Sequence, residues 1–357
     1  MAERNLLEEL MELLQEPGRI NWALADQLAD HLSGPSEAID PWLADEYLEI
    51  ARTARMRFTD ATDLRVDHTL QPVLVDRKDW ARLHLRSFGY MVEPLADLKG
   101  GGEGPLDSLL QPLGAIMAGL HAGLLAGSLS CAFGTFDTGL PTARPLGFTF
   151  HIPAIERFAS EYDLDPLQVR MWVALHEVAH EALLGLPWVR PYLIDLLGDL
   201  TPDLEFDLNL LPEWQDALTD PQLPVGNFDF GPTLFSGEID EDRHEKLQAA
   251  MSMLEGYVTY LVGEASEGYL PDREEITSAW IEHLSARYEE LESAGAFPKT
   301  TAATGGGTDF YYEVRERWGS EAVGKVWLSS ENLPTVQEIE DVTGWAARVL
   351  LDDPFTE

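Results

Sequence analysis

The strongest constraint on the fold of this chain is a segment with helix signals at both ends, from Asp165 to Leu184. Asp165 is in position to cap the helix, Pro166 follows in the first turn, and Gln168 is expected to complete a capping pair. The helix is predicted to stop near Gly185. Most residues in its second half are uncharged, which is typical of a helix with apolar surroundings.

Two histidines and a glutamate lie within this helix, in the order His176, Glu177 and His180. Four residues turn an α-helix through about 400°, so His176 and His180 project from one face, one turn apart. Two neutral imidazoles at this spacing can share one Zn²⁺ ion, and Glu177 can act beside the metal without binding it. The alternative is that both histidines are satisfied within a core while Glu177 faces solvent.

A catalytic zinc ion needs a third protein ligand and one open position. A metzincin would carry glycine at 183 and histidine at 186, whereas this chain has Leu183 and Leu186, so that class is excluded. We predict Glu255 as the third ligand, because it interrupts an apolar run at 249–254 on a later predicted helix. A carboxylate among apolar neighbours needs a compensating cation.

Two alternatives to Glu255 as a ligand remain open at this point. Glu255 could pair with an arginine, or it could lie at a solvated edge near Gln248 and Thr259. His244 is a second candidate for the third ligand, although its charged neighbours suggest a solvated helix start.

The rest of the chain predicts a mainly α-helical fold with a small β-sheet, the α+β class. Apolar residues at helical spacing predict helices at about 6–14, from 21, at 41–58, after 79, at about 241–262 and at about 272–292, followed by a helix-rich end. Val73–Val75 predicts a short strand. Alternating residues at 129–136 and 146–152 predict two more strands, and the turn residues at 137–141 predict that these two form a hairpin.

An apolar stretch from Leu113 to Gly127 raises the question of a membrane segment. It has 15 residues, whereas a spanning helix needs about 20, so we predict a buried helix. Gly119, Gly123 and Gly127 recur every four residues along it, which would let a neighbouring helix approach closely.

Glycine-rich stretches suggest the domain organisation. The run at 100–102 is the best candidate linker and separates an N-terminal helical region, 1–100, from a metal-binding catalytic region, 105–357. Residues 196–240 are rich in proline and aspartate and predict a long surface excursion, and the glycines at 305–307 predict a mobile loop.

Composition limits the possible partners and the cellular location. The chain has 24 Lys and Arg residues against 63 Asp and Glu residues, a net charge of −39, which argues against nucleic-acid binding and against a polybasic membrane anchor. A single cysteine, Cys131, excludes internal disulfides and a multi-cysteine zinc site. The acidic, amphipathic N-terminus does not read as a signal peptide, so we expect a cytoplasmic protein.

The segment Trp172–His180, with Leu186, Pro187 and Trp188 after it, resembles a family of zinc-dependent metallopeptidases common in actinobacteria. Some members are labelled as associated with deazaflavin coenzyme biosynthesis. Further similar stretches extend the resemblance from about 20 to 350: Asn21–Trp22, Asp76–Arg77 with Trp80, Leu254–Gly256, Leu333–Thr335, Glu338–Ile339 and Trp345.

This resemblance implies a zincin-like catalytic core with an appended helical region. It implies that His176, His180 and Glu255 bind zinc and that Glu177 is the general base. The chain departs from the family at Tyr257, where members usually have histidine, and at Ala179, where they tend to have threonine. Tyr257 lies about 200° around the helix from Glu255, so the first departure is not expected to reach the metal.

These patterns together predict a zinc-dependent hydrolase, and most specifically a metallopeptidase acting on a peptide or protein substrate. A zinc-activated water would attack the carbonyl, with Glu177 as the general base. Two other functions remain open: a non-catalytic protein with a structural zinc site, and an acidic helical interaction protein. The oligomeric state does not follow from the sequence.

Overall fold

The computed structural model describes residues 18–66, 70–96, 107–144, 147–198, 205–206, 235–236, 241–293 and 305–351. Its α-helices are α2 (Trp22–Ser33), α3 (Pro41–Ala61), α4 (Arg77–His84), α5 (Glu93–Ala96), α6 (Asp107–Leu129), α7 (Ile152–Glu161), α8 (Pro166–Leu184), α9 (Val189–Gly198), α11 (Glu241–Ser266), α12 (Arg273–Ser293), α13 (Gly305–Trp318), α14 (Ser320–Lys325), α15 (Val336–Glu340) and α16 (Val342–Val349). Two 3-10 helices, η1 (Leu85–Met91) and η5 (Ser330–Asn332), join them. The strands are β1 (Val73–Val75), β2 (Thr149–His151), β3 (Glu205–Phe206) and β4 (Phe235–Ser236), so the predicted fold class is confirmed.

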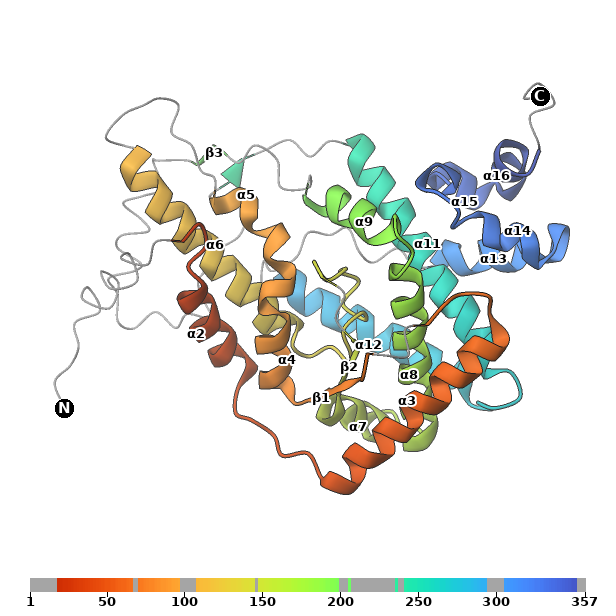
Figure 1. Ribbon diagram of the computed structural model, residues 1–357, viewed down its shortest axis with the longest axis horizontal. Helices are drawn as coiled ribbons and strands as arrows, with labels where there is room; N and C mark the ends of the chain where they lie inside the picture. The colour runs from red at the N-terminus through yellow and green to blue at the C-terminus, as the bar shows by residue number, and fades with distance from the viewer. Residues whose placement is uncertain are drawn as a thin grey trace.

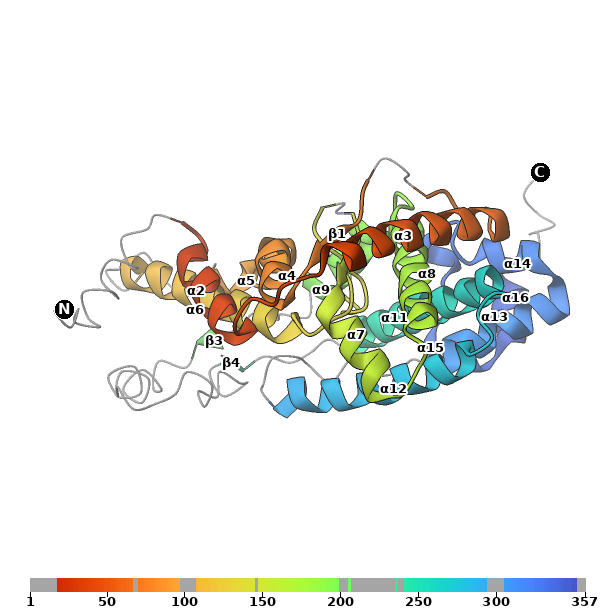
Figure 2. The ribbon, with the colours of Figure 1, turned by 90° about the horizontal axis from the view of Figure 1, so that it is seen from below.

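The helices form an elongated body with α8 near its middle (Figure 1). Helices α2, α4, α5 and α6 lie at one end, and α13 to α16 lie at the other. In the second view α3 runs along one side and α12 along the opposite side, with α8 and α11 between them (Figure 2). Helix α8 packs against α3, α7, α11 and α12, which surrounds it with apolar side chains.

Helices α2 and α6 approach closely because of the predicted glycine stripe. A Cβ atom on Gly119 would overlap the carbonyl oxygen of Asn21, and one on Gly123 would lie 2.7 Å from the carbonyl oxygen of Ala25. Gly127 likewise leaves room for Leu32. The helix predicted to be buried is therefore packed against α2. No helix in the described ranges is both long enough and apolar enough to cross a membrane.

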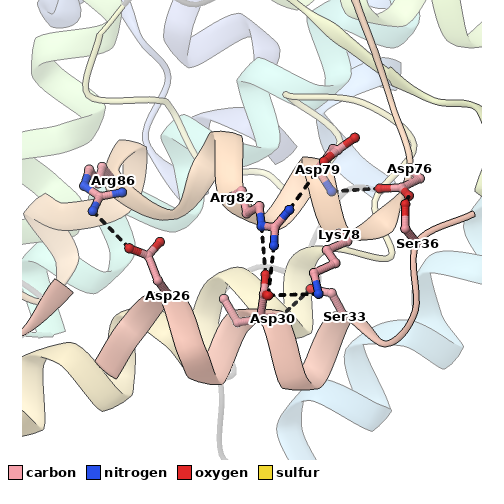
Figure 3. Close-up of polar contacts among 10 residues, drawn as sticks. Asp26, Asp30, Ser33, Ser36, Asp76, Lys78, Asp79, Arg82 and Arg86 are labelled. Atoms are coloured by element: carbon pink, nitrogen blue, oxygen red, sulfur yellow. Dashed lines mark hydrogen bonds and ion pairs between the residues drawn. The ribbon is translucent and has the colours of Figure 1, made fainter. Parts of the chain in front are cut away.

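Ion pairs join α2 to α4 and to η1 on the solvent side of this packing (Figure 3). Asp30 lies 2.8 Å from Lys78 Nζ and 2.8 Å from Arg82 Nε, and Asp26 lies 3.1 Å from Arg86. Asp76 caps α4 by accepting a hydrogen bond of 2.8 Å from the Asp79 amide. The paired side chains are partly exposed, so each pair adds little stability by itself.

The predicted hairpin is wrong. Residues 130–136 form a turn after α6 rather than a strand, and β2 pairs in parallel with β1, Val73 opposite Thr149 and Val75 opposite His151. Phe133 and Phe136 of this stretch are buried in the main core, but from an irregular backbone. Periodicity alone could not separate these two structures.

The glycines at 305–307 do not form the predicted loop, because α13 begins at Gly305. Gly307 and Gly256 face each other where α13 crosses α11. A Cβ atom on Gly256 would lie 2.6 Å from the amide nitrogen of Thr308, and one on Gly307 would lie 2.8 Å from the carbonyl carbon of Ser252. The glycines therefore serve a close helix crossing.

Several predicted features lie outside the described residues, namely the helix at 6–14, the linker at 100–102 and most of the excursion at 196–240. Within that excursion the structure describes only the end of α9 and the antiparallel pair of β3 and β4. The division into regions 1–100 and 105–357 remains a prediction. Helices of the two regions pack against each other, since α2 contacts α6 and α3 contacts α8.

Candidate metal centre

Helix α8 carries His176, Glu177 and His180 of the predicted zinc motif. Asp165 Oδ1 accepts hydrogen bonds from the amides of Leu167, at 2.8 Å, and Gln168, at 3.1 Å, so the predicted cap is confirmed. The Gln168 side chain does not complete a capping pair. It instead bonds Asp272 through both amide atoms, which ties the start of α8 to the start of α12.

His180 and Glu255 meet across the contact between α8 and α11. His180 Nε2 lies 3.1 Å from Glu255 Oε1, and the His180 Nδ1 atom lies 2.9 Å from the carbonyl oxygen of His176. Burial acts to lower the pKa of His180, but the Glu255 carboxylate outweighs it and raises that pKa to about 9. Among the described residues, Glu255 thus pairs with a histidine of the motif rather than with an arginine, and its side chain is 26% exposed.

His176 lies one turn before His180 and packs against Trp172. The two ring centroids of Trp172 and His176 are 3.8 Å apart, and the His176 and His180 centroids are 6.5 Å apart. Burial, with the neighbouring His180 charge, holds the pKa of His176 well below its usual range. The imidazole is therefore neutral, which is the form that binds metals.

The donor set fits zinc in its chemistry, since two imidazoles and one carboxylate are the ligands of many catalytic zinc sites. Ligand atoms 2.1 Å from a tetrahedral ion are about 3.4 Å apart, close to the 3.1 Å between His180 and Glu255. His176 does not lie at this ligand spacing from His180 and Glu255. Among the described residues, no three His, Cys, Asp or Glu side chains already have a metal-binding arrangement. Completing the set requires His176 to approach the other two.

Glu177 points from α8 toward the turn that follows α6. It is 1% exposed, and its carboxylate accepts hydrogen bonds from the amides of Thr135, at 2.9 Å, and Phe136, at 3.2 Å. Burial raises the pKa of Glu177 to about 8, and the charge of Asp137 adds to the effect. A carboxyl group with a pKa close to neutrality can both accept and donate a proton in a reaction.

His244 does not lie with these residues. It precedes Glu255 by eleven positions on α11, which is about 16 Å along the helix axis. The alternative third ligand is therefore too far from His180, which contacts Glu255 directly.

One buried charge next to the motif is explained only by the structure. Glu181 pairs with Arg55 of α3 at 3.2 Å, and both side chains are 7% exposed. Arg55 also donates a hydrogen bond of 2.6 Å to the carbonyl oxygen of Leu70. Glu181 directly follows the second histidine, and no spacing in the sequence connects it to Arg55, which lies 126 residues earlier.

Comparisons with known proteins give the family and the fold of this chain. A family model described as zincin-like metallopeptidase matches residues 20–346. A crystal structure from Chloroflexus aurantiacus, provisionally described as a hydrolase with a novel fold, superposes with a TM-score of 0.66 at 22% sequence identity. The match covers 93% of this chain and 99% of that one, and shows a shared fold. A search of curated proteins gives no match. The chain belongs to the zincin-like metallopeptidase family.

Proposed function

We propose that this member of the zincin-like metallopeptidase family is a zinc-dependent hydrolase that cleaves peptide bonds. His176, His180 and Glu255 would hold the metal, and Glu177 would be the general base. One observation carries the proposal: His180 and Glu255, 75 residues apart in the sequence, meet at 3.1 Å between α8 and α11. A carboxylate facing the histidine motif supplies the ligand that the helix alone lacks.

Zinc, when bound, supplies a Lewis acid that polarises a carbonyl group and makes water more acidic. The chain supplies the proton transfers. The Glu177 carboxylate would take a proton from the attacking water and give it to the leaving amine, which its position next to His176 supports. Its two backbone hydrogen bonds fix the carboxylate in one orientation.

The first test measures zinc content and peptide hydrolysis together. We expect one zinc ion per chain by elemental analysis, and cleavage of at least one member of a fluorogenic peptide library. Glu255→Gln should lower zinc content severalfold and abolish cleavage, because a neutral amide is a poor zinc ligand. Glu264→Gln is the matched control, since Glu264 lies on the same helix and pairs with Arg315 at the surface.

Full zinc and full turnover in Glu255→Gln would exclude Glu255 as the ligand. A chain that binds no zinc in any preparation would contradict the proposal and favour the acidic interaction protein, for which the net charge of −39 is the supporting observation. The predicted lack of nucleic-acid and membrane partners also rests on this net charge.

A structural zinc site is the second candidate, and the deep burial of Glu177 favours it. Glu177→Gln separates the two functions. An enzyme should keep its zinc and lose its rate by a factor of about 10² to 10⁴, the usual contribution of a general base. A protein with a structural site should keep its zinc, and neither the wild type nor the variant should hydrolyse peptides.

A further inference from the structure

The turn at 132–137 is held in place by a side chain of α4 and by backbone amides of β2. Trp80 of α4 donates a hydrogen bond of 2.7 Å from Nε1 to the carbonyl oxygen of Gly134. From β2, the His151 amide donates to the carbonyl oxygen of Phe133 at 2.8 Å, and the Thr149 amide donates to Thr135 Oγ1 at 3.0 Å. These three hydrogen bonds fix the turn and none of them involves α8.

Asp137 fixes the same turn from within. Its carboxylate accepts the amides of Phe133, at 2.8 Å, and Gly134, at 3.0 Å. The next two amides along the chain, those of Thr135 and Phe136, point the other way and donate to Glu177. Four consecutive amides are thus divided between two carboxylates.

Gly134 leaves the space that Glu177 occupies. A Cβ atom there would overlap the carboxyl group of Glu177, reaching 2.7 Å from Oε2. Gly134 does not have a positive φ, so its backbone would accept alanine. The absence of a side chain at this position therefore serves the approach of Glu177, not the shape of the turn.

We propose that the turn at 132–137 is a preformed clamp that positions the Glu177 carboxylate, with Gly134 and Asp137 as positioning residues. Its effect on catalysis rests on the proposed function. The clamp itself does not, because it consists of contacts within the chain. A backbone clamp is rigid, and a general base loses rate steeply when its carboxylate moves by an ångström.

The clamp is tested first without any assay of activity, by a double-mutant cycle of thermal stability. Gly134→Ala should lower the melting temperature of the full-length protein, because the new methyl group displaces a buried carboxylate. In a Glu177→Ala background the same substitution should have little effect, because the overlapping group is gone. An equal loss in both backgrounds would overturn the clamp.

Amide hydrogen exchange gives a second readout, which remains available if Gly134→Ala does not fold. Removing the carboxylate in Glu177→Ala should make the Thr135 and Phe136 amides exchange at least tenfold faster than in the wild type. The Phe133 amide, bonded to Asp137, is the internal control and should change less. Unchanged exchange at Thr135 and Phe136 would contradict the proposal.

The catalytic role is tested with the zinc-loaded protein and a peptide that the wild type cleaves. Gly134→Ala should lower kcat at least tenfold while KM and zinc content stay within twofold, since a Cβ atom on Gly134 meets Glu177, whereas the turn reaches the proposed ligand His180 through the ring of Phe136, 6.0 Å away between centroids. Gly324→Ala is the matched control, because a Cβ atom there meets open space. If Gly134→Ala keeps its kcat, positioning is refuted while the hydrolase stands. If the wild type cleaves no peptide, the proposed function fails, and the stability cycle still decides the clamp.

Discussion

Arg55 and Glu181 show how a single buried pair fixes the surroundings of the motif. Glu181 follows the second histidine directly, and its side chain turns away from Glu255 toward α3. Two charges at 7% exposure are costly to remove from water, so the pair is tolerated only because each satisfies the other. The guanidinium also lies 4.9 Å from the ring centroid of Phe148, which extends its contacts to the segment before β2.

Removing one member of this pair should therefore be strongly destabilising. Arg55→Met removes the cation that pairs with the buried Glu181 carboxylate, and we expect the free energy of unfolding to fall by about 3–5 kcal/mol. Urea denaturation followed by circular dichroism measures the change. Arg55→Met combined with Glu181→Leu should recover most of the loss, because no charge then remains unpaired. A double variant as unstable as Arg55→Met would show that packing, and not charge, is the cause.

Two pairs of helices in this molecule cross closely at glycine residues. Gly119 and Gly123 bring α6 onto α2, and Gly256 with Gly307 brings α13 onto α11. The second crossing lies next to Glu255, so the position of the proposed third ligand depends on how closely α11 is held. A glycine in a helix costs about 1 kcal/mol of propensity, which the contact between the two backbones offsets.

Alanine substitution tests this crossing. Gly307→Ala would press a methyl group against the backbone of Ser252, which cannot move without shifting α11. We expect a loss of about 1–3 kcal/mol in the free energy of unfolding, the usual cost of overpacking. Gly324→Ala, with open space around the new methyl group, should be neutral or stabilising by up to about 1 kcal/mol. Equal effects in denaturant titrations of both variants would contradict a crossing that requires glycine.

The net charge of −39 acts on the molecule as a whole. Like charges spread over one surface repel each other, and this repulsion destabilises the compact state. Salt screens such repulsion, with a Debye length of about 10 Å at 0.1 M and about 3 Å at 1 M. Salt also weakens local pairs such as Asp30 with Arg82, but the side chains of this pair are partly exposed, so it contributes little stability.

Added salt should therefore stabilise this protein. We expect the melting temperature to rise by about 5 °C between 0.1 M and 1 M NaCl, measured by differential scanning calorimetry. Potassium chloride should act equally, because screening depends on ionic strength and not on the identity of the cation. A melting temperature that stays constant or falls across the series would show that repulsion is not a major term.

The sequence was informative wherever the signal is local. The bounds of α8, the placement of two histidines on one of its faces and the close approach permitted by Gly119, Gly123 and Gly127 all follow from spacing within one helix. The meeting of Glu255 with His180 was predicted from the cost of placing a carboxylate in an apolar helix. Whether the set binds zinc remains a prediction.

Tertiary structure decided whatever depends on pairing between distant segments. Residues 129–136 have the alternation of a strand, yet Leu129 ends α6 and the residues after it form the turn that bonds Glu177, because β2 forms its strand ladder with β1. The sequence likewise does not indicate that Arg55 pairs with Glu181 or that Gly307 lies against Gly256. Periodicity and capping record what a segment prefers by itself, whereas burial, strand pairing and the distance between two backbones exist only once the chain has packed.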